Sequence, residues 1–160
     1  MTTLKDAYDR FGAGIFRHAV AICRNQADAE DVVSAVFVKL AVRLEVGTLV
    51  HNPKAYLHRI THNECMRLVE RRAKSPCLIE HPDDLDLLQV SESHPDTSQV
   101  NHALAALPAE QREVCVLHFF EGMSFVDIAA ALSISVNTIT SRYRYARKKL
   151  ALLLEPSHDV

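Results

Sequence analysis

The chain has 160 residues, of which 48% are hydrophobic, 24% charged and 6% aromatic, and its formal net charge is -2. This composition is ordinary for a globular protein and argues against a disordered chain or a coiled coil. No apolar run reaches the roughly 18 residues of a membrane-spanning helix, so we expect no transmembrane segment. The few Gly and Pro residues stand between segments with helical periodicity, which predicts an all-α fold.

The four Cys residues are widely spaced and form no Cys-x-x-Cys pair. This favours reduced thiols in a cytoplasmic protein, and the charged N-terminus lacks the apolar stretch of a signal peptide. His62 with Cys65, and Cys115 with His118, could each place two metal ligands on one helix face. Structural zinc sites usually contain closely spaced Cys pairs, so we predict no metal and no cofactor. No P-loop or nucleophile–base pair is evident, which argues against an enzyme.

Two helices are expected first. Residues 4–23 place apolar side chains at steps of three and four, which predicts an amphipathic helix with a packed face. That face comprises Leu4, Tyr8, Phe11, Ile15, Ala19 and Ile22. Asn25 can cap a second helix that extends to about Leu44. Its first turn is acidic, which is favourable at the positive end of the helix dipole.

A third helix should begin at Asn52 and Pro53 and extend to about Lys74. Residues 51–75 hold six basic and two acidic side chains, a local net charge of +4. One stripe of this helix carries Tyr56, Arg59, Asn63 and Arg67. Such a stripe is either a solvated face or a nucleic-acid surface, on which an aromatic ring stacks on a base while cations hold phosphates. From these residues alone, the solvated face is the favoured interpretation.

An acidic segment follows. Residues 76–107 contain six acids and no Lys or Arg. Within it, residues 76–97 contain Pro and many turn-forming residues and show no long helical period, which is typical of a linker. The sequence therefore predicts two small helical domains, 1–75 and 98–155, joined by an acidic linker.

The second domain contains a predicted helix-turn-helix. A helix should begin at Leu107 and Pro108 and end near Gly122. Ser124 can cap a short helix, and the turn 133–135 leads into a basic one. Two helices joined by such a short turn are typical of DNA-binding proteins, in which the second helix enters the major groove.

The basic helix sorts its side chains by face. Residues 135–150 contain five basic residues and no acid, whereas a merely solvated helix usually mixes both signs. One side should pack against the preceding helices, through Ile139, Tyr143, Ala146, Leu150 and Leu153. The opposite side carries Asn137, Ser141, Arg144 and Lys148, flanked by Arg142, Arg147 and Lys149. Central polar groups that read bases and flanking cations that reach phosphates would form a recognition helix, so we predict DNA binding.

With these elements in view, the sequence resembles the extracytoplasmic-function sigma factors of bacterial RNA polymerase. Residues 107–150 are similar throughout to the family's region 4. The specific marks are Leu107-Pro108, Arg112, Glu121-Gly122, Ser124, Ile128-Ala129, Leu132, Thr138, Ser141-Arg142 and Ala146-Arg147. Residues 28–40 and 52–63 resemble two parts of region 2.

The resemblance implies a factor that binds core RNA polymerase, through its beta-prime clamp and beta flap, and directs promoter recognition without inserting into a membrane. An anti-sigma factor is a further candidate partner. The implied polymerase-binding set is Asp28, Glu30, Asp31, Ser34 and Lys39. The implied minus-ten set is Asn52, Tyr56, Arg59, Asn63, Arg67 and Arg71. The implied minus-thirty-five set is Asn137, Thr138, Thr140, Ser141, Arg142, Arg144, Tyr145, Arg147 and Lys148.

Several positions depart from the family pattern. Ser34-Ala35 replaces the usual Gln-Glu, Tyr56 replaces a Trp, and Tyr145 replaces the first Arg of Arg-Ala-Arg, which makes Arg144 the better candidate for reading bases. Ser133 stands in the turn where Gly is common. Two other functions therefore stay open: a stand-alone helix-turn-helix regulator of duplex DNA, and a sigma-like protein with weakened polymerase docking.

Overall fold

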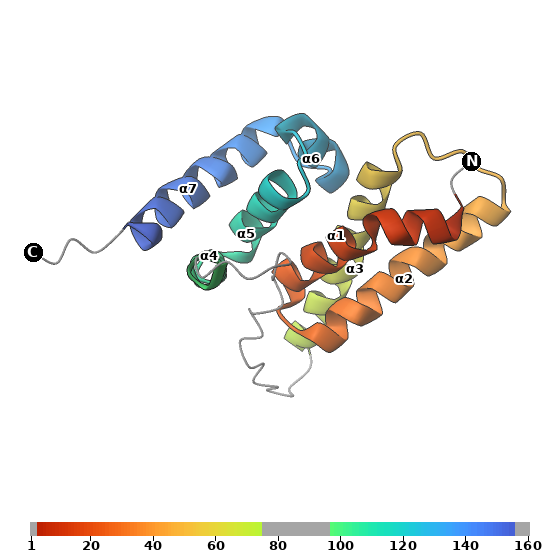
Figure 1. Cartoon of the computed structure of the whole chain (residues 1–160), viewed down its shortest axis with the longest axis horizontal. Helices are drawn as coiled ribbons and strands as arrows, with labels where there is room; N and C mark the ends of the chain where they lie inside the picture. Colours follow the sequence, from red (N-terminus) through yellow and green to blue (C-terminus); the bar gives the residue numbers. More distant parts are fainter. Residues whose placement is uncertain (1–2, 75–96, 156–160) are drawn as a thin grey trace, which may run out of the picture.

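The structure, a computed structural model, describes residues 3–74 and 97–155, and within these ranges every regular element is a helix (Figure 1). The helices are α1 (Leu4–Cys23), α2 (Gln26–Glu45), α3 (Pro53–Lys74), α4 (Thr97–Ala105), α5 (Ala109–Cys115), α6 (Phe125–Leu132) and α7 (Val136–Leu154), and a π-helical turn, η2 (Val116–Phe120), continues α5. The all-α prediction is confirmed. The predicted linker lies outside the described residues except for Thr97, which begins α4.

Short polar side chains begin the helices where the sequence predicts. The Asn25 side chain accepts a hydrogen bond from the Asp28 backbone N–H, and the Ser124 hydroxyl accepts one from Asp127. Ser135 caps α7 through the backbone N–H of Thr138. Because these bonds satisfy backbone donors that the first turn leaves unpaired, the starts of the helices are encoded locally.

The turn between α6 and α7 depends on one residue in the left-handed conformation. Ser133 has φ 57° and ψ 43°, a region that glycine adopts most readily. Its backbone N–H donates to the carbonyl of Ala129, and the N–H of Ile134 donates to the same carbonyl. These bonds close the C-terminus of α6, so the helix-turn-helix forms with Ser in place of Gly.

The helices form two apolar clusters. The first lies mainly among α1, α2 and α3, and its fully buried members include Ile15, Val36 and Leu57. The second lies among α5, η2, α6 and α7, around Ile128 and Ile139. The first cluster also contains residues from the second half of the chain: Leu104, Leu107, Cys115, Val116 and Ala146. The two predicted helical domains are therefore packed against each other through a shared core.

The predicted packed faces are wrong at the helix ends. Leu4, Tyr8 and Leu153 are exposed, although the helical period places them with buried residues. The end of α7 extends away from the other described helices (Figure 1), so none of them covers its last turn. Tyr8 meets the edge of Phe37 at a ring-centroid distance of 5.1 Å but leaves most of its surface open. None of the described helices combines the length and apolar character needed to cross a membrane.

Candidate nucleic-acid interface

The basic face of α7 is open to solvent. Its exposed members from the predicted minus-thirty-five set are Asn137, Ser141, Arg144, Tyr145, Arg147 and Lys148. The opposite side is held by Ile139 and Ala146, which are completely buried. The helix therefore presents polar and cationic groups outward while its apolar residues hold it against the fold, as the helical period predicts.

Two threonines of the same set are engaged within the helix. The Thr138 hydroxyl lies 2.8 Å from the Ser135 hydroxyl, and the Thr140 hydroxyl donates to the Val136 carbonyl at 2.9 Å. Both side chains are only half-exposed. They shape the first turns of α7, whereas the exposed side chains farther along are free to meet a ligand.

A shallow hollow separates α7 from the start of α5. Its lining includes Glu110 and Gln111 from α5 and Asn137, Ser141 and Tyr145 from α7. Arg142 also lines it and reaches toward Glu110, at 3.6 Å between Nη2 and Oε2. The Arg142 side chain is 22% exposed and is thus already shared with an acid of the same molecule.

The predicted minus-ten residues of α3 are exposed to solvent, except for Tyr56. Arg59, Asn63, Arg67 and Arg71 are exposed. Arg67 lies 3.3 Å from Glu64, one turn away, and Glu64 also pairs with Lys39 of α2. Asn52 caps α3, because its side-chain oxygen accepts from the Ala55 N–H at 3.2 Å. The predicted stripe therefore combines three groups that are open to a ligand with ion pairs that hold α2 and α3 together.

Tyr56 does not offer a free stacking surface. Its ring is half-buried against the first apolar cluster, and the Arg43 guanidinium lies over it, 4.7 Å from the centroid. A cation over the ring face is a stabilising contact, but it occupies the surface that an unstacked base would need. Arg43 comes from a different helix, so helical periodicity could not place it over Tyr56.

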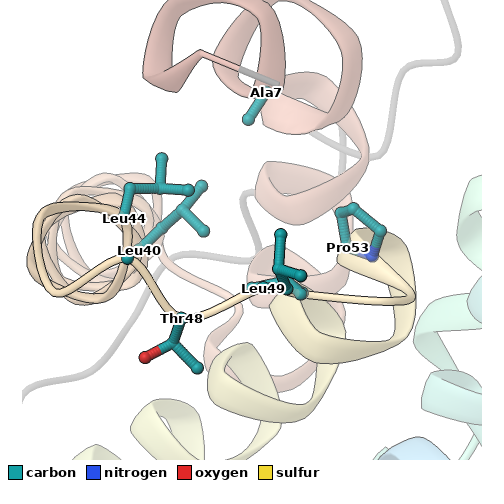
Figure 2. Close-up of a pocket in the computed structure, with 8 residues that line it drawn as sticks. Ala7, Leu40, Leu44, Thr48, Leu49 and Pro53 are labelled. Atoms are coloured by element: carbon teal, nitrogen blue, oxygen red, sulfur yellow. The ribbon is translucent and has the colours of Figure 1, made fainter. Parts of the chain in front are cut away.

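An apolar hollow beside the loop that joins α2 and α3 was not foreseen from the sequence. It has a volume of about 390 Å³ and is lined by Ala7, Leu40, Leu44, Gly47, Thr48, Leu49, Val50 and Pro53. Figure 2 shows Leu49 pointing toward the hollow and Thr48 turned away from it. Gly47, at φ 76°, turns the chain at the end of α2. The only signal in the sequence was a loop with several apolar residues.

The predicted polymerase-binding residues divide into two groups. Glu30, Asp31 and Ser34 are exposed on α2, and two of them, Glu30 and Ser34, border a hollow between α1 and α2. Asp28 is buried and pairs with Arg72 of α3, so its carboxylate faces inward. Lys39 is exposed but pairs with Glu64. Ionic docking through α2 is therefore open mainly to Glu30 and Asp31, with Ser34 as an exposed polar neighbour.

The exposed side of α2 also carries apolar residues. Val38, Val42 and Val46 are exposed and follow one another at steps of four residues. Side chains four residues apart lie on the same helix face, so these valines form one stripe. We call Val38, Val42 and Val46 the valine stripe.

Buried polar groups join the two halves of the chain. The Nε2 atom of His18 lies 2.8 Å from Oε1 of Glu113, and Nδ1 of His62 lies 2.6 Å from the same oxygen. His18 also meets His58, with 2.9 Å between their Nδ1 atoms. Arg17 donates to Glu121 at 2.9 Å and 3.1 Å. The contact between α1–α3 and α5 is thus polar at its centre as well as apolar.

Two of these groups have strongly shifted pKa values. Burial, followed by electrostatic interactions with His18, Lys54 and Arg17, lowers the pKa of His58 to about 2. Burial alone would raise the pKa of Glu113, but hydrogen bonds from His18 and His62 outweigh it and lower that pKa to about 2. His58 is therefore neutral and Glu113 ionised near neutral pH.

The Arg112 side chain also connects α5 to α1 and to the end of α4. Its guanidinium donates to the carbonyls of Leu104, Leu107 and Ala21, at 3.0 Å, 2.7 Å and 2.6 Å, and more distantly to that of Ala105. Three of these carbonyls end or follow α4, and Ala21 belongs to α1. Arg112 therefore adds side-chain donors to backbone carbonyls at and just after the ends of α1 and α4, although the Leu104 carbonyl also accepts from the Leu107 N–H.

Comparison with known proteins agrees with this arrangement. Residues 7–75 match the family model described as Sigma-70 region 2, and residues 97–150 match Sigma-70, region 4. The ECF RNA polymerase sigma factor SigL of Mycobacterium tuberculosis is 30% identical over 161 residues, which cover 95% of this chain and 89% of SigL. SigE of Mycolicibacterium smegmatis is 30% identical over 149 residues, and the match covers 85% of this chain but only 55% of SigE.

Two solved structures share the fold. The sigma factor RpoE from Bartonella quintana, in complex with the anti-sigma factor NepR, superposes with a TM-score of 0.72 at 27% identity and covers 96% of this chain and 99% of its own. CnrH, in complex with the cytosolic domain of CnrY, gives a TM-score of 0.65 at 28% identity over 94% of this chain and 86% of CnrH. With both regions matched in order along nearly the whole chain, the protein belongs to the sigma-70 family, among the extracytoplasmic-function sigma factors of RNA polymerase.

Proposed function

We propose that this sigma factor divides promoter recognition between two surfaces. The exposed face of α7, with Arg144 and Lys148 at its centre, reads the minus-thirty-five element in the major groove. Arg59, Asn63, Arg67 and Arg71 of α3 contact the minus-ten element. The observation that carries the proposal is the charge sorting of α7, whose exposed face is polar and cationic and whose opposite face is buried. The functional domains are residues 1–75 and 98–155, joined by 76–97.

Strand opening at the minus-ten element needs a receptor for an unstacked base. Since Arg43 covers the ring of Tyr56, we assign this role to the apolar hollow under the α2–α3 loop. Its apolar lining suits the face of a base, and the exposed cations of α3 can hold the adjoining phosphates. Opening is then driven by binding, with no covalent step, so the protein is not an enzyme.

Polymerase docking uses α2. The acidic residues Glu30 and Asp31 and the valine stripe give α2 both charged and apolar contact surface, which is the composition of a protein interface with an apolar centre and a polar rim. The exposed Ser34 at the neighbouring hollow joins this surface. Because its proposed partners, core polymerase and promoter DNA, are in the cytoplasm, we propose that the protein acts there. The two structural neighbours were solved in complexes with NepR and CnrY, so an anti-sigma factor is a further proposed partner.

The two regions must separate on promoter DNA. The two promoter elements lie about 25 base pairs apart, which corresponds to about 85 Å of duplex at about 3.4 Å per pair. A compact chain of this length has a radius of gyration of about 15 Å. Simultaneous contact with both elements therefore requires the contact between α1–α3 and α5 to open.

Co-elution with core RNA polymerase in the absence of DNA tests the proposal. A stand-alone regulator of duplex DNA would elute separately, and a factor with weakened docking would co-elute only at low salt. Asp31→Arg should reduce co-elution because it reverses an exposed charge on α2. Glu70→Arg, an equal charge change at an exposed position of α3 outside the docking surface, should co-elute like the unmodified protein. Equal behaviour of both variants would contradict docking through α2.

A further inference from the structure

Three potential metal ligands meet where the two regions pack together. They are Nε2 of His18 on α1, Nδ1 of His62 on α3 and a carboxylate oxygen of Glu113 on α5, and all lie within 4.8 Å of one another. Glu113 Oε1 lies 2.8 Å from the His18 nitrogen and 2.6 Å from the His62 nitrogen. Each ligand atom comes from a different helix, so the fold itself, and no local motif, assembles the group.

We propose that His18, His62 and Glu113 bind one divalent transition-metal ion of the Zn²⁺ type, which bridges region 2 and region 4. Two imidazoles and one carboxylate are a donor set that Zn²⁺ uses, with a water molecule as fourth ligand. Zinc bonds of about 2.0–2.2 Å place tetrahedral ligands about 3.3–3.6 Å apart. The two nitrogens therefore need to move outward from the carboxylate oxygen only slightly.

The surroundings suit a bound cation. The Glu113 side chain is 3% exposed and that of His18 is 0% exposed, so the site is shielded from competing water. The His62 side chain is 17% exposed and borders solvent, which gives an ion a route of entry. A buried carboxylate is costly unless a positive charge compensates it, and a divalent ion would provide that charge.

His58 is placed to orient the His18 ligand. The Nδ1 atoms of His18 and His58 lie 2.9 Å apart. If the metal occupies Nε2 of His18, the proton of that ring resides on Nδ1 and is donated to His58, which fixes the ring orientation. The Nε2–H of His58 then faces Glu121, whose Oε2 lies 3.9 Å away. Histidine ligands in metal sites usually have such a partner for the second ring nitrogen.

A bridging ion would favour the closed arrangement. His18 and His62 belong to region 2, whereas Glu113 belongs to region 4. A ligand that needs residues of both regions binds the closed form and stabilises it by RT ln(1 + L/Kd), where L is the free-ion concentration. The alternative is a metal-free cluster in which both imidazoles only donate hydrogen bonds to Glu113. The metal site and the metal-free cluster differ in whether the isolated protein takes up an ion.

Titration of the full-length, tag-free protein with Co²⁺, followed by displacement with Zn²⁺, tests the site. We expect one ion per chain and visible absorption bands of a four-coordinate Co²⁺ site. His62→Asn removes one ligand but keeps a donor for Glu113, and it should weaken affinity about tenfold or more. His102→Asn, at an exposed position of α4, should bind like the unmodified protein. No uptake, or equal affinity in His62→Asn, would overturn the site.

Hydrogen exchange tests the bridge without any transcription assay, so its result does not depend on the sigma function. With Zn²⁺ bound, amide exchange should slow in α1, α3 and α5 of the unmodified protein and should not change in His62→Asn. Glu113→Gln should lose the protection of α5. Protection confined to α1 and α3 would show that the ion is held by region 2 alone and would overturn the bridge between the regions.

Discussion

The Nε2 atom of His18 lies 2.8 Å from Oε1 of Glu113, although 95 positions separate the two residues in the chain. This hydrogen bond joins α1 of region 2 to α5 of region 4, and both side chains are buried. In the proposed function, simultaneous contact with both promoter elements breaks this hydrogen bond. The compact form is therefore held by specific polar contacts in addition to the shared apolar core, and those contacts determine how easily the protein opens.

Replacing Arg112 with Met should reduce the free energy of unfolding by about 3 kcal/mol, because the buried carbonyls of Ala21 and Leu107 lose the guanidinium donor at once. Arg71→Met, at an exposed position on α3, should change stability by less than about 0.5 kcal/mol. Urea denaturation followed by circular dichroism measures both. Similar small losses in the two variants would mean that water replaces the guanidinium without cost.

Acid should destabilise the protein in a window set by His58. Its pKa falls from 6.5 to about 2 on folding, so between these values the unfolded chain binds the additional proton. Stability then decreases as pH falls below 6.5, by about 1.4 kcal/mol per pH unit. Glu113, whose pKa falls from 4.5 to about 2, adds a second loss in the same direction below pH 4.5.

Urea midpoints at pH 7.0 and 5.5 test the contribution of His58. His58→Asn keeps an acceptor for His18 but cannot titrate, so the variant should lose less stability over this interval than the unmodified protein. Identical losses in the two proteins would assign the acid sensitivity to other groups.

Arg144 and Lys149 should differ in the kind of binding they support. Arg144→Ala should cost about 1–3 kcal/mol on a matched minus-thirty-five duplex and relax sequence preference, since Arg recognises guanine edges. Lys149→Ala should weaken matched and scrambled duplexes alike, as expected for a phosphate contact. Fluorescence anisotropy on both duplexes gives the comparison. Equal losses of Arg144→Ala on the two duplexes would remove Arg144 as a base reader.

Substitution of Tyr56 should reduce stability, whereas substitution of Asn63 should impair strand opening. Tyr56→Ala should cost about 2 kcal/mol of stability, because the ring packs on the core beneath Arg43. The exposed Asn63 can be changed to Ala without such a loss. Asn63→Ala should instead reduce transcription from a closed promoter, and a pre-melted bubble template should restore much of it. If the bubble template does not rescue Asn63→Ala, Asn63 does not act in strand opening.

The sequence alone predicted those features that depend on residues close together in the chain. Asn25 and Ser124 cap their helices as expected, because a cap involves residues only three positions apart. The exposed cationic face of α7 was also predictable, since the helical period fixes which side chains share a side.

Contacts between distant segments could not be predicted in this way. Nothing in the spacing of His18, His58, His62 and Glu113 shows that they meet, because tertiary packing brings them together. The position of Arg43 over Tyr56 and the hollow under the α2–α3 loop have the same origin. Leu153 was placed wrongly because periodicity assigns a face to a residue but does not show whether a neighbouring helix covers it.

Run-off transcription with core RNA polymerase on a promoter library tests the central claim most directly. The account predicts that adding this protein yields transcripts from a subset of promoters that share a minus-thirty-five and a minus-ten sequence. It also predicts that Arg144→Ala broadens the minus-thirty-five preference and leaves the minus-ten preference unchanged. Core polymerase that gives the same transcripts with and without the protein would contradict the account.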